Sequence, residues 1–403
     1  MILNSKRSNI APFLAIDMLT KANNLKLKGQ DIIHMDVGEP GVSTPKHILK
    51  YAKEIIGKKN IGYTESIGIP ELRCQISRHY NSWYNQEVTS NCIAITSGAS
   101  GAFVLALLAM FDPGDTIVMM TPYYPAYVNA IKALNLNIEF IEGEHSSGYQ
   151  PTVEKLKGLN KKIKGVIIAS PANPTGSILK NIELKKIANW CKKNNKVIIC
   201  DEIYHGIEYG QKSDTILSYN KDAIVINSFS KYFCMTGWRL GWIIAPKNII
   251  DVIEKLSMSL FLCPSTIAQI IATRAFNDYN ILDKNVAIYN KNRDLLINFF
   301  ENKGLYKYAP ADGAFYLYID ISNISDNLYI SHLAQTQSNS LFNSISSIFN
   351  QINIKIDSII SNFFAYSTQE IIHYNNENNE NIWYGIIFLN PNSSNPSSVK
   401  FYT

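Results

Sequence analysis

The chain has 403 residues, of which 46% are hydrophobic and 18% are charged, and its formal net charge at pH 7 is +5. This length is sufficient for two domains and a large core, and the composition is ordinary for a soluble globular protein. Basic residues are spread along the chain without interleaved aromatic residues, so the sequence lacks the common signature of nucleic-acid binding.

No segment has the length of a transmembrane helix, and residues 1–18 lack the apolar stretch of a secretory signal. The longest apolar run, residues 102–111, is instead predicted to form a buried helix. The six cysteines are scattered without metal-ligand spacing. We therefore expect a cytoplasmic protein with reduced cysteines, no metal site, and neither a membrane nor a nucleic acid as partner.

Residues 1–45 are predicted to form an arm and then a loop, because turn residues interrupt the chain around Gly38. Pro70 is well placed in the first turn of a helix. From residue 92 onward, short apolar runs alternate with helical segments. The runs lie at 92–96, 116–120, 138–141, 166–169, 197–200, 224–226 and 242–245. This alternation predicts an α/β fold with a mostly parallel sheet and helices on both faces.

Lys231 lies just past the expected strand at 224–226, where ligands bind in open α/β sheets. A lysine that forms an imine with an aldehyde must be desolvated and held by its neighbours. The nearby Ser228, Ser230 and Arg239 would suit an anionic group on that aldehyde, such as a phosphate. The alternative is an ordinary surface lysine, and this stretch alone does not decide between the two.

Other polar residues also follow expected strands. Asp201 comes after the strand at 197–200 with Tyr204 close behind, and Asn173 follows the strand at 166–169. Each has a simpler explanation, because a strand-end Asp is usually a helix cap and Asn-Pro-Thr-Gly is usually a turn. Residues 97–101 open a helix whose backbone N–H groups could hold a phosphate, although a glycine-rich turn alone is a weak signal. Their occurrence together in this order is much harder to obtain by chance.

In this order the motifs resemble those of class I/II aminotransferases, pyridoxal-phosphate enzymes of the aspartate aminotransferase fold type. The matching motifs are Ser97-Gly98-Ala99-Ser100, Asn173-Pro174-Thr175-Gly176, Asp201-Glu202-Ile203-Tyr204, Ser228-Phe229-Ser230-Lys231 and Thr236-Gly237-Trp238-Arg239-Leu240-Gly241. The similarity runs from about residue 38 to about residue 318. It implies transfer of an amino group between an amino acid and a 2-oxo acid, within amino acid metabolism and biosynthesis.

The resemblance assigns roles around a bound pyridoxal 5'-phosphate. Lys231 would form the internal aldimine and move the proton between substrate and cofactor carbons. Asp201 would pair with the pyridine nitrogen and keep it protonated, which makes the ring an electron sink. Tyr204 and Asn173 would hydrogen-bond the ring 3-oxygen, and Tyr124 would stack on the ring.

The resemblance also assigns the cofactor phosphate and the substrate. The phosphate would be held by Ser228, Ser230, Arg239 and the backbone of Ala99 and Ser100. Tyr63 matches a tyrosine that reaches the phosphate from the neighbouring subunit, which predicts a homodimer with shared active sites. Gly38 and Asn173 would lie beside the substrate.

Three parts are expected of this fold. Residues 1–45 would form an arm and part of a smaller domain, residues 46–275 the large cofactor-binding domain, and residues 276–403 the smaller α+β domain. A long helix through 291–300 and a strand at 314–319 fit the last part. Beyond Asp320 the composition becomes atypical, because Asn, Ser and Ile dominate.

The C-terminal part also departs from the family. The expected arginine that grips the substrate carboxylate is missing, since Arg293 is the last arginine and neither Lys355 nor Lys400 matches its context. Three explanations stay open: a diverged substrate site, a frame-shifted and misfolded end, or a specialised tail on a protein that binds the cofactor without turnover. We favour the frame shift, which predicts an arginine-containing continuation in another reading frame after the codon for Asp320.

Two other functions remain as alternatives. The first is a cofactor-binding but substrate-impaired product, and the second is a β-eliminating lyase, since the same cofactor residues serve several reactions. A dehydrogenase is a distant third, because residues 97–101 lack the dinucleotide fingerprint.

Overall fold

The computed structural model describes most of the chain up to residue 320. The described residues are 4–12, 14–29, 37–58, 61–159, 162–302, 304 and 306–320, together with the strand residues 374–375, 381–382 and 384–388. Among them, no helix is long and apolar enough to span a membrane. Within the same residues, no group of three or more His, Cys, Asp or Glu side chains could hold a metal ion.

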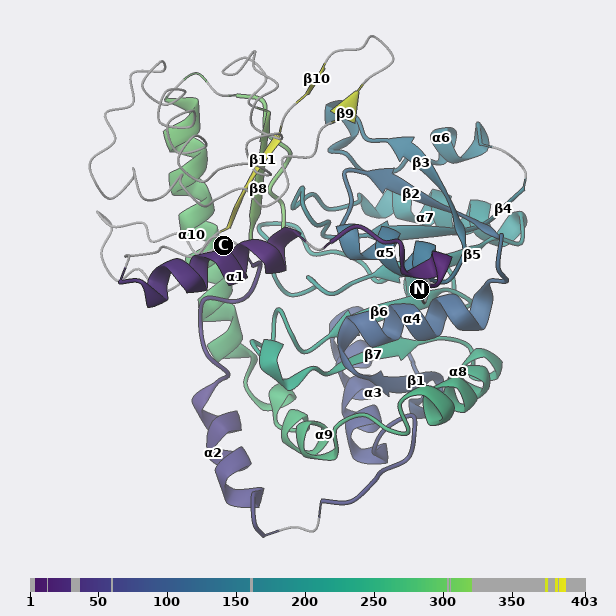
Figure 1. Cartoon of the computed structure of the whole chain (residues 1–403), viewed down its shortest axis with the longest axis vertical. Helices are drawn as coiled ribbons and strands as arrows, with labels where there is room; N and C mark the ends of the chain where they lie inside the picture. Colours follow the sequence, from purple (N-terminus) through teal and green to yellow (C-terminus); the bar gives the residue numbers. More distant parts are fainter. Residues whose placement is uncertain are drawn as a thin grey trace.

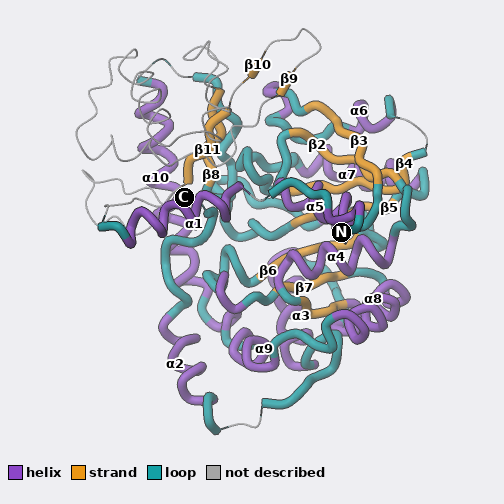
Figure 2. The backbone as a smooth tube through the Cα atoms, viewed as in Figure 1, coloured by secondary structure: helices purple, strands orange, loops and turns teal. Residues whose placement is uncertain are grey.

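A seven-stranded sheet forms the centre of the described part, in the order β1-β7-β6-β5-β4-β2-β3 (Figure 1, Figure 2). Its strands are β1 (Ile93–Thr96), β2 (Thr116–Thr121), β3 (Asn137–Glu142), β4 (Ile163–Ala169), β5 (Val197–Asp201), β6 (Ile224–Ser228) and β7 (Gly241–Ile244). β7 runs antiparallel to both β1 and β6, and every other neighbouring pair is parallel. The predicted mostly parallel α/β sheet is confirmed.

The strands are buried on both faces because alternate side chains enter two different cores. In β4, Val166 and Ile168 belong to one apolar cluster, and Ile167 between them belongs to the other. In β6, Val225 joins the first cluster, whereas its neighbour Ile226 joins the second. This is why the sequence shows continuous apolar runs at these strands and not an alternating pattern.

Helices cover both faces of the sheet (Figure 1). The second cluster includes side chains of α4 (Gly98–Met110), α5 (Pro125–Ala133) and α8 (Lys247–Leu260). The first includes side chains of α2 (Lys46–Ile55), α3 (Pro70–Tyr84), α6 (Val153–Lys157), α7 (Asn181–Lys193) and α9 (Thr266–Ala272). Pro70 lies in the first turn of α3, as predicted. The N-terminal helix α1 (Leu14–Leu27) follows an arm whose Ala11 carbonyl accepts a hydrogen bond from Asn129 of α5 at 3.2 Å.

The last described elements lie to one side of the sheet (Figure 1). They are α10 (Tyr279–Glu301), β8 (Tyr316–Asp320), β9 (Tyr374–Asn375), β10 (Asn381–Ile382) and β11 (Tyr384–Phe388). β8 pairs antiparallel with β11, and β9 pairs antiparallel with β10. The long helix and the strand at 314–319 expected from the sequence correspond to α10 and β8. Apart from the three short strands after residue 320, the atypical end of the chain lies outside the described residues.

Candidate active site

A cavity of about 510 Å³ opens where the carboxyl ends of β4, β5 and β6 meet the first turn of α4. All but two of the site residues predicted from the sequence line it: Gly38, Ala99, Ser100, Tyr124, Asn173, Asp201, Tyr204, Ser230, Lys231 and Arg239. The two exceptions are Ser228 and Tyr63. The strand-end rule therefore brings most of the predicted residues together.

The Lys231 amine lies inside this cavity. Its Nζ atom donates a hydrogen bond to the Gly38 carbonyl oxygen and lies 5.8 Å and 5.6 Å from the ring centres of Tyr204 and Phe315. The pKa of Lys231 is lowered to about 8, chiefly by burial; Glu39 opposes this effect, Arg239 adds to it, and Asp201 opposes it. The surface-lysine alternative is therefore wrong, and part of the amine is unprotonated near neutral pH.

Asp201 is the last residue of β5 and is only 5% exposed. It accepts hydrogen bonds from the Tyr127 hydroxyl and, at 3.1 Å, from the Ile203 backbone N–H. Burial raises the pKa of Asp201 to about 6, and the two hydrogen bonds and the Lys231 charge partly offset this effect. A buried carboxyl group of this kind is well suited to a cationic ring nitrogen.

Tyr127 was not predicted as a site residue. It lies on α5 one helical turn after Tyr124, so both side chains can face the cavity. The sequence signal for Tyr127 was its position three residues after Tyr124, within the helix that begins at Pro125. Tyr123, by contrast, stacks on Phe140 at a ring distance of 5.1 Å.

An anion cradle also lines the cavity. It is formed by the first turn of α4, the Ser230 hydroxyl and the Arg239 guanidinium. Gly98 has φ +70°, and a Cβ atom there would lie 2.7 Å from Arg239 Nη2. Glycine is thus needed for the guanidinium to approach the helix N-terminus, where backbone N–H groups favour a bound anion.

Ser228 lies behind this cradle and does not line the cavity. Its hydroxyl is 2.9 Å from the Ser230 hydroxyl and 3.0 Å from the Leu240 carbonyl oxygen, and it accepts the Ser230 backbone N–H at 3.0 Å. These contacts hold the hydroxyl and the backbone of Ser230, so Ser228 supports Ser230 and does not face the cavity itself. The sequence motif could not separate the two hydroxyls, because both belong to the same short segment.

The aromatic wall of the cavity includes a second residue that was not predicted. The Tyr204 hydroxyl is hydrogen-bonded to the hydroxyl of Tyr316, the first residue of β8. The sequence pattern of β8 offered no signal that distinguishes Tyr316 from its neighbours, because residues 314–319 are all apolar or aromatic.

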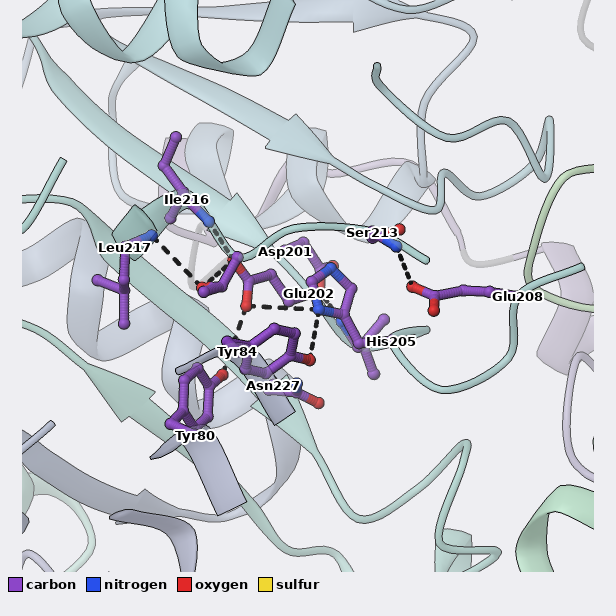
Figure 3. Close-up of polar contacts among 12 residues, drawn as sticks. Tyr80, Tyr84, Asp201, Glu202, His205, Glu208, Ser213, Ile216, Leu217 and Asn227 are labelled. Atoms are coloured by element: carbon purple, nitrogen blue, oxygen red, sulfur yellow. Dashed lines mark hydrogen bonds and ion pairs between the residues drawn. The ribbon is translucent and has the colours of Figure 1, made fainter. Parts of the chain in front are cut away.

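A buried polar cluster supports the turn after β5 (Figure 3). Glu202 accepts hydrogen bonds from the Thr215 hydroxyl and the Ile216 N–H, both at 2.9 Å. His205 Nδ1 lies 2.7 Å from the Tyr84 hydroxyl and 3.7 Å from Glu202 Oε2. Asp201 and Tyr204 face the cavity, whereas Glu202 and His205 lie in this cluster, so it holds the turn from the other side.

Both ionisable groups of this cluster are uncharged at neutral pH. Burial raises the pKa of Glu202 to about 8 and lowers the pKa of His205 to about 3. Asp201 is the carboxyl group of this turn that lines the cavity.

Tyr63 does not reach the cavity of its own chain. Its side chain is 85% exposed, in a segment joined to α9 by a 2.6 Å hydrogen bond from Thr266 to the Gly62 carbonyl oxygen. Such exposure leaves the side chain available to a second subunit.

Arg293, the last arginine of the sequence, also lies away from the cavity. It donates to the Ala311 carbonyl oxygen at 3.2 Å, pairs with Asp294 at 2.8 Å and lies 4.9 Å above the Tyr209 ring centre. Among the described residues that line the cavity, the cationic side chains are Lys231 and Arg239.

These residues fit pyridoxal phosphate at three separate points. The Lys231 amine suits its aldehyde, the buried Asp201 carboxyl group suits its ring nitrogen, and the cradle around Gly98 suits its phosphate. The cradle depends on a glycine at that position, so the fit rests on backbone shape as well as on residue type.

Comparisons with known proteins agree with this geometry. A profile of the family "Aminotransferase class I and II" matches residues 30–347. Valine–pyruvate aminotransferase of Mycobacterium tuberculosis is 36% identical over 327 residues, which covers 80% of this chain and 84% of that protein. Aspartate aminotransferase of Thermotoga maritima is 30% identical over 324 residues, covering 79% and 85%. These names do not favour the lyase or the damaged-product alternatives.

Solved structures show the same likeness. A crystal structure of an aminotransferase from Mycobacterium tuberculosis has a TM-score of 0.79 and 35% identity, covering 83% of this chain and 88% of that chain. Aspartate aminotransferase from Thermus thermophilus with maleate has a TM-score of 0.78 and 26% identity, covering 83% and 90%. The chain therefore belongs to the class I and II aminotransferases, pyridoxal-phosphate-dependent enzymes that move an amino group between an amino acid and a 2-oxo acid.

Proposed function

We propose that this aminotransferase holds pyridoxal phosphate in the described cavity through Lys231, Asp201 and the cradle of Ser230 and Arg239. The observation that carries the proposal is the convergence of a buried amine, a buried carboxyl group and an anion cradle on one cavity. When bound, the cofactor supplies an electrophilic carbon and a ring that accepts electrons from the substrate carbon.

The residues of this chain then bind, orient and move protons. Lys231 would hold the cofactor through its amine and would carry the proton to and from the substrate carbon, roles that its pKa of about 8 favours. The Asp201 carboxylate would hold a proton on the ring nitrogen. Tyr204 and Asn173 would contact the ring 3-oxygen, and Tyr124 would pack against the ring.

The phosphate would be bound by the Ala99 and Ser100 backbone together with Ser230 and Arg239. Ser228 would hold Ser230 in place through the contact between their hydroxyls. Gly38 and Asn173 are proposed to lie beside the substrate, Gly38 because its carbonyl oxygen accepts a hydrogen bond from Lys231.

An aliphatic amino acid is the proposed substrate class, with valine and pyruvate as the first pair to test. One relative is named valine–pyruvate aminotransferase. Phe103, Val104 and Ala130 give the cavity apolar walls. The cations in the described lining, Lys231 and Arg239, are both assigned to the cofactor.

A homodimer that shares its active sites is proposed from the position of Tyr63. Large apolar side chains are exposed on two linked segments: Ile61, Tyr63, Met258, Leu260, Phe261 and Leu262. The segments are joined by hydrogen bonds from Ser257 to Ser66 at 3.1 Å and from Thr266 to Gly62 at 2.6 Å. Burying this surface against a second copy would let Tyr63 reach the partner's phosphate cradle.

The remaining proposals concern the chain as a whole. We propose a cytoplasmic enzyme of amino acid biosynthesis with an arm at 1–45, a large domain at 46–275 and a smaller domain at 276–403.

The test is a visible absorption spectrum of the purified protein with pyridoxal phosphate, before and after addition of L-valine or L-aspartate. We expect a visible band that valine removes faster than aspartate, and that pyruvate restores. A band that neither amino acid changes would contradict substrate capture, and faster loss with aspartate would contradict the substrate class. Absence of a band in folded protein would contradict the cofactor site.

A further inference from the structure

The pair formed by Tyr204 and Tyr316 joins two parts of the chain that are far apart in sequence. Their hydroxyls are hydrogen-bonded, and the rings lie 5.4 Å apart at an angle of 76°. The residues are 3% and 2% exposed. Both side chains also line the cavity. The mechanism described above uses Tyr204 and leaves Tyr316 without a role.

The backbone before Tyr316 is fixed to the two loops that carry Asn173 and Tyr204. The Gly313 N–H donates to the Gly176 carbonyl oxygen, and the Ala314 N–H donates to the Ile207 carbonyl oxygen, both at 2.8 Å. Ala314 also accepts a hydrogen bond from the Tyr209 hydroxyl. The hydroxyl of Tyr316 is therefore held at a set position relative to Tyr204.

Only one of the two hydroxyls can donate in the bond between them. If Tyr316 donates, the Tyr204 proton stays available for another acceptor, and a chain of two hydrogen bonds strengthens each member. Burial raises the pKa of both hydroxyls, and nearby Tyr124 and Asp201 raise both further, so both keep their protons at neutral pH. Lys231 is the cation nearby, with its Nζ 5.8 Å from the Tyr204 ring centre.

We propose that Tyr316 is a positioning residue whose hydroxyl donates to Tyr204 and thereby directs the Tyr204 proton toward the ring 3-oxygen of bound pyridoxal phosphate. The inference rests on the proposed function, in which Tyr204 contacts that oxygen. It gives β8, the strand that pairs with β11 near the end of the chain, an influence on the cofactor that acts through Tyr204.

The experiment compares the wild-type protein with Tyr204→Phe, Tyr316→Phe and the double variant. The readout is the apparent pKa of the visible absorption band of the bound cofactor, measured by pH titration without substrate. Phenylalanine keeps the ring packing, including the 5.2 Å contact of Tyr316 with Phe315, and removes only the hydroxyl. Tyr289→Phe is the matched control, because Tyr289 is equally buried and its hydroxyl has no hydrogen-bond partner among the described residues.

We expect both single variants to raise the apparent pKa of the cofactor's absorption band. Each weakens the hydrogen bond donated to the ring 3-oxygen, and this oxygen is more negative after the bound cofactor has lost its proton. The shift should be roughly one pH unit for Tyr204→Phe, the size expected for a hydrogen bond to a charged group, and smaller for Tyr316→Phe. The double variant should match Tyr204→Phe, since Tyr316 acts through Tyr204. Tyr289→Phe should leave the value unchanged.

Replacement of Tyr316 by 3-fluorotyrosine provides a second variant that keeps the hydroxyl. The fluorine makes the hydroxyl a stronger donor, so the apparent pKa should fall below the wild-type value. This change requires no loss of a buried hydrogen bond and is therefore informative even if Tyr316→Phe does not fold.

Several results would overturn the inference. An unchanged pKa in Tyr316→Phe, or in the fluorotyrosine protein, beside a shifted one in Tyr204→Phe would remove Tyr316 from the mechanism and leave the proposed function intact. A shift from Tyr316→Phe that persists in the Tyr204→Phe background would show direct action on the cofactor. No shift in Tyr204→Phe would instead refute the proposed role of Tyr204, and the inference with it.

Discussion

The Lys231 amine donates a hydrogen bond to the carbonyl oxygen of Gly38, a residue distant in the sequence. This contact joins the lysine proposed to carry the cofactor to the loop expected beside the substrate. The carbonyl oxygen thus provides an acceptor for an amine whose desolvation is unfavourable.

Replacement of Lys231 by alanine should remove the covalent attachment of the cofactor and the proton transfer together. We expect loss of the visible band and a decrease in turnover of at least about a thousandfold, because the nucleophile and the general base are the same group. The measurement is an absorption spectrum with a transamination assay. Lys255→Ala, at an exposed position on α8, is the control and should behave as the wild type.

The Tyr127 hydroxyl should set the pH at which Asp201 becomes charged. Its hydrogen bond lowers the pKa of Asp201, which burial has raised to about 6. Tyr127→Phe should raise that pKa, so cofactor affinity, which increases as Asp201 loses its proton, should rise at a higher pH than in the wild type. Cofactor dissociation constants between pH 5 and pH 8 would test this.

Asp201→Asn extends the same experiment, because it removes the titratable carboxyl group altogether. It should weaken cofactor binding by about tenfold or more and remove the part of the pH dependence that comes from Asp201. If Tyr127→Phe and the wild type have the same midpoint, the hydroxyl does not tune the carboxyl group.

Glu202 should make the folded protein less stable as the pH rises. Its pKa is raised from 4.5 to about 8 by burial, so the folded state binds more protons than the unfolded state between these values. Stability from this group is therefore lost as the pH rises through that range, whereas Glu202→Gln has no such proton to lose. The free energy of unfolding of Glu202→Gln relative to the wild type should increase from pH 6.5 to pH 8.

Urea denaturation of the cofactor-free protein at both pH values would measure this difference. Glu87→Gln, an exposed substitution, is the control and should show no change with pH. Comparison with the wild type is necessary because burial also raises the pKa of Glu208 to about 7. A constant difference between the Glu202→Gln and wild-type proteins would mean that Glu202 is charged in the folded state at pH 6.5.

Gly98→Ala should damage the phosphate cradle. The added Cβ atom would lie 2.7 Å from Arg239 Nη2, at a backbone φ of +70° that alanine rarely adopts. We expect cofactor affinity to fall by about tenfold, the effect of losing one charged hydrogen bond. Gly101→Ala on the same helix is the control, because its Cβ would make only an ordinary 3.5 Å contact with Ser97. Equal affinities in the two variants would refute the cradle.

Tyr63→Phe should weaken cofactor binding without changing the oligomeric state. The reason is that the proposed contact uses only the hydroxyl, whereas the ring remains to fill the interface. Phe261→Glu places a charge on the exposed apolar surface and should instead favour the monomer. Sedimentation velocity with cofactor titration would separate the effects. A monomeric wild type would contradict the shared active site.

The sequence alone determined the sheet and most of the predicted site residues that line the cavity, because both depend on local patterns. A strand buried on both faces is a continuous apolar run, and the residue after it lies at the carboxyl edge whatever the rest of the chain does. Lys231, Asp201 and Asn173 were found in this way. The resemblance of their motifs then indicated the family.

Only the tertiary structure decided the contacts that depend on packing between distant elements. Tyr127 on α5 contacts Asp201 at the end of β5, and Tyr316 reaches Tyr204 because β8 begins beside the turn after β5. Arg293 binds the Ala311 carbonyl oxygen, a role that residue type could not reveal. The partner of a side chain depends on how two distant segments fold in space. A local sequence pattern describes only one of those segments.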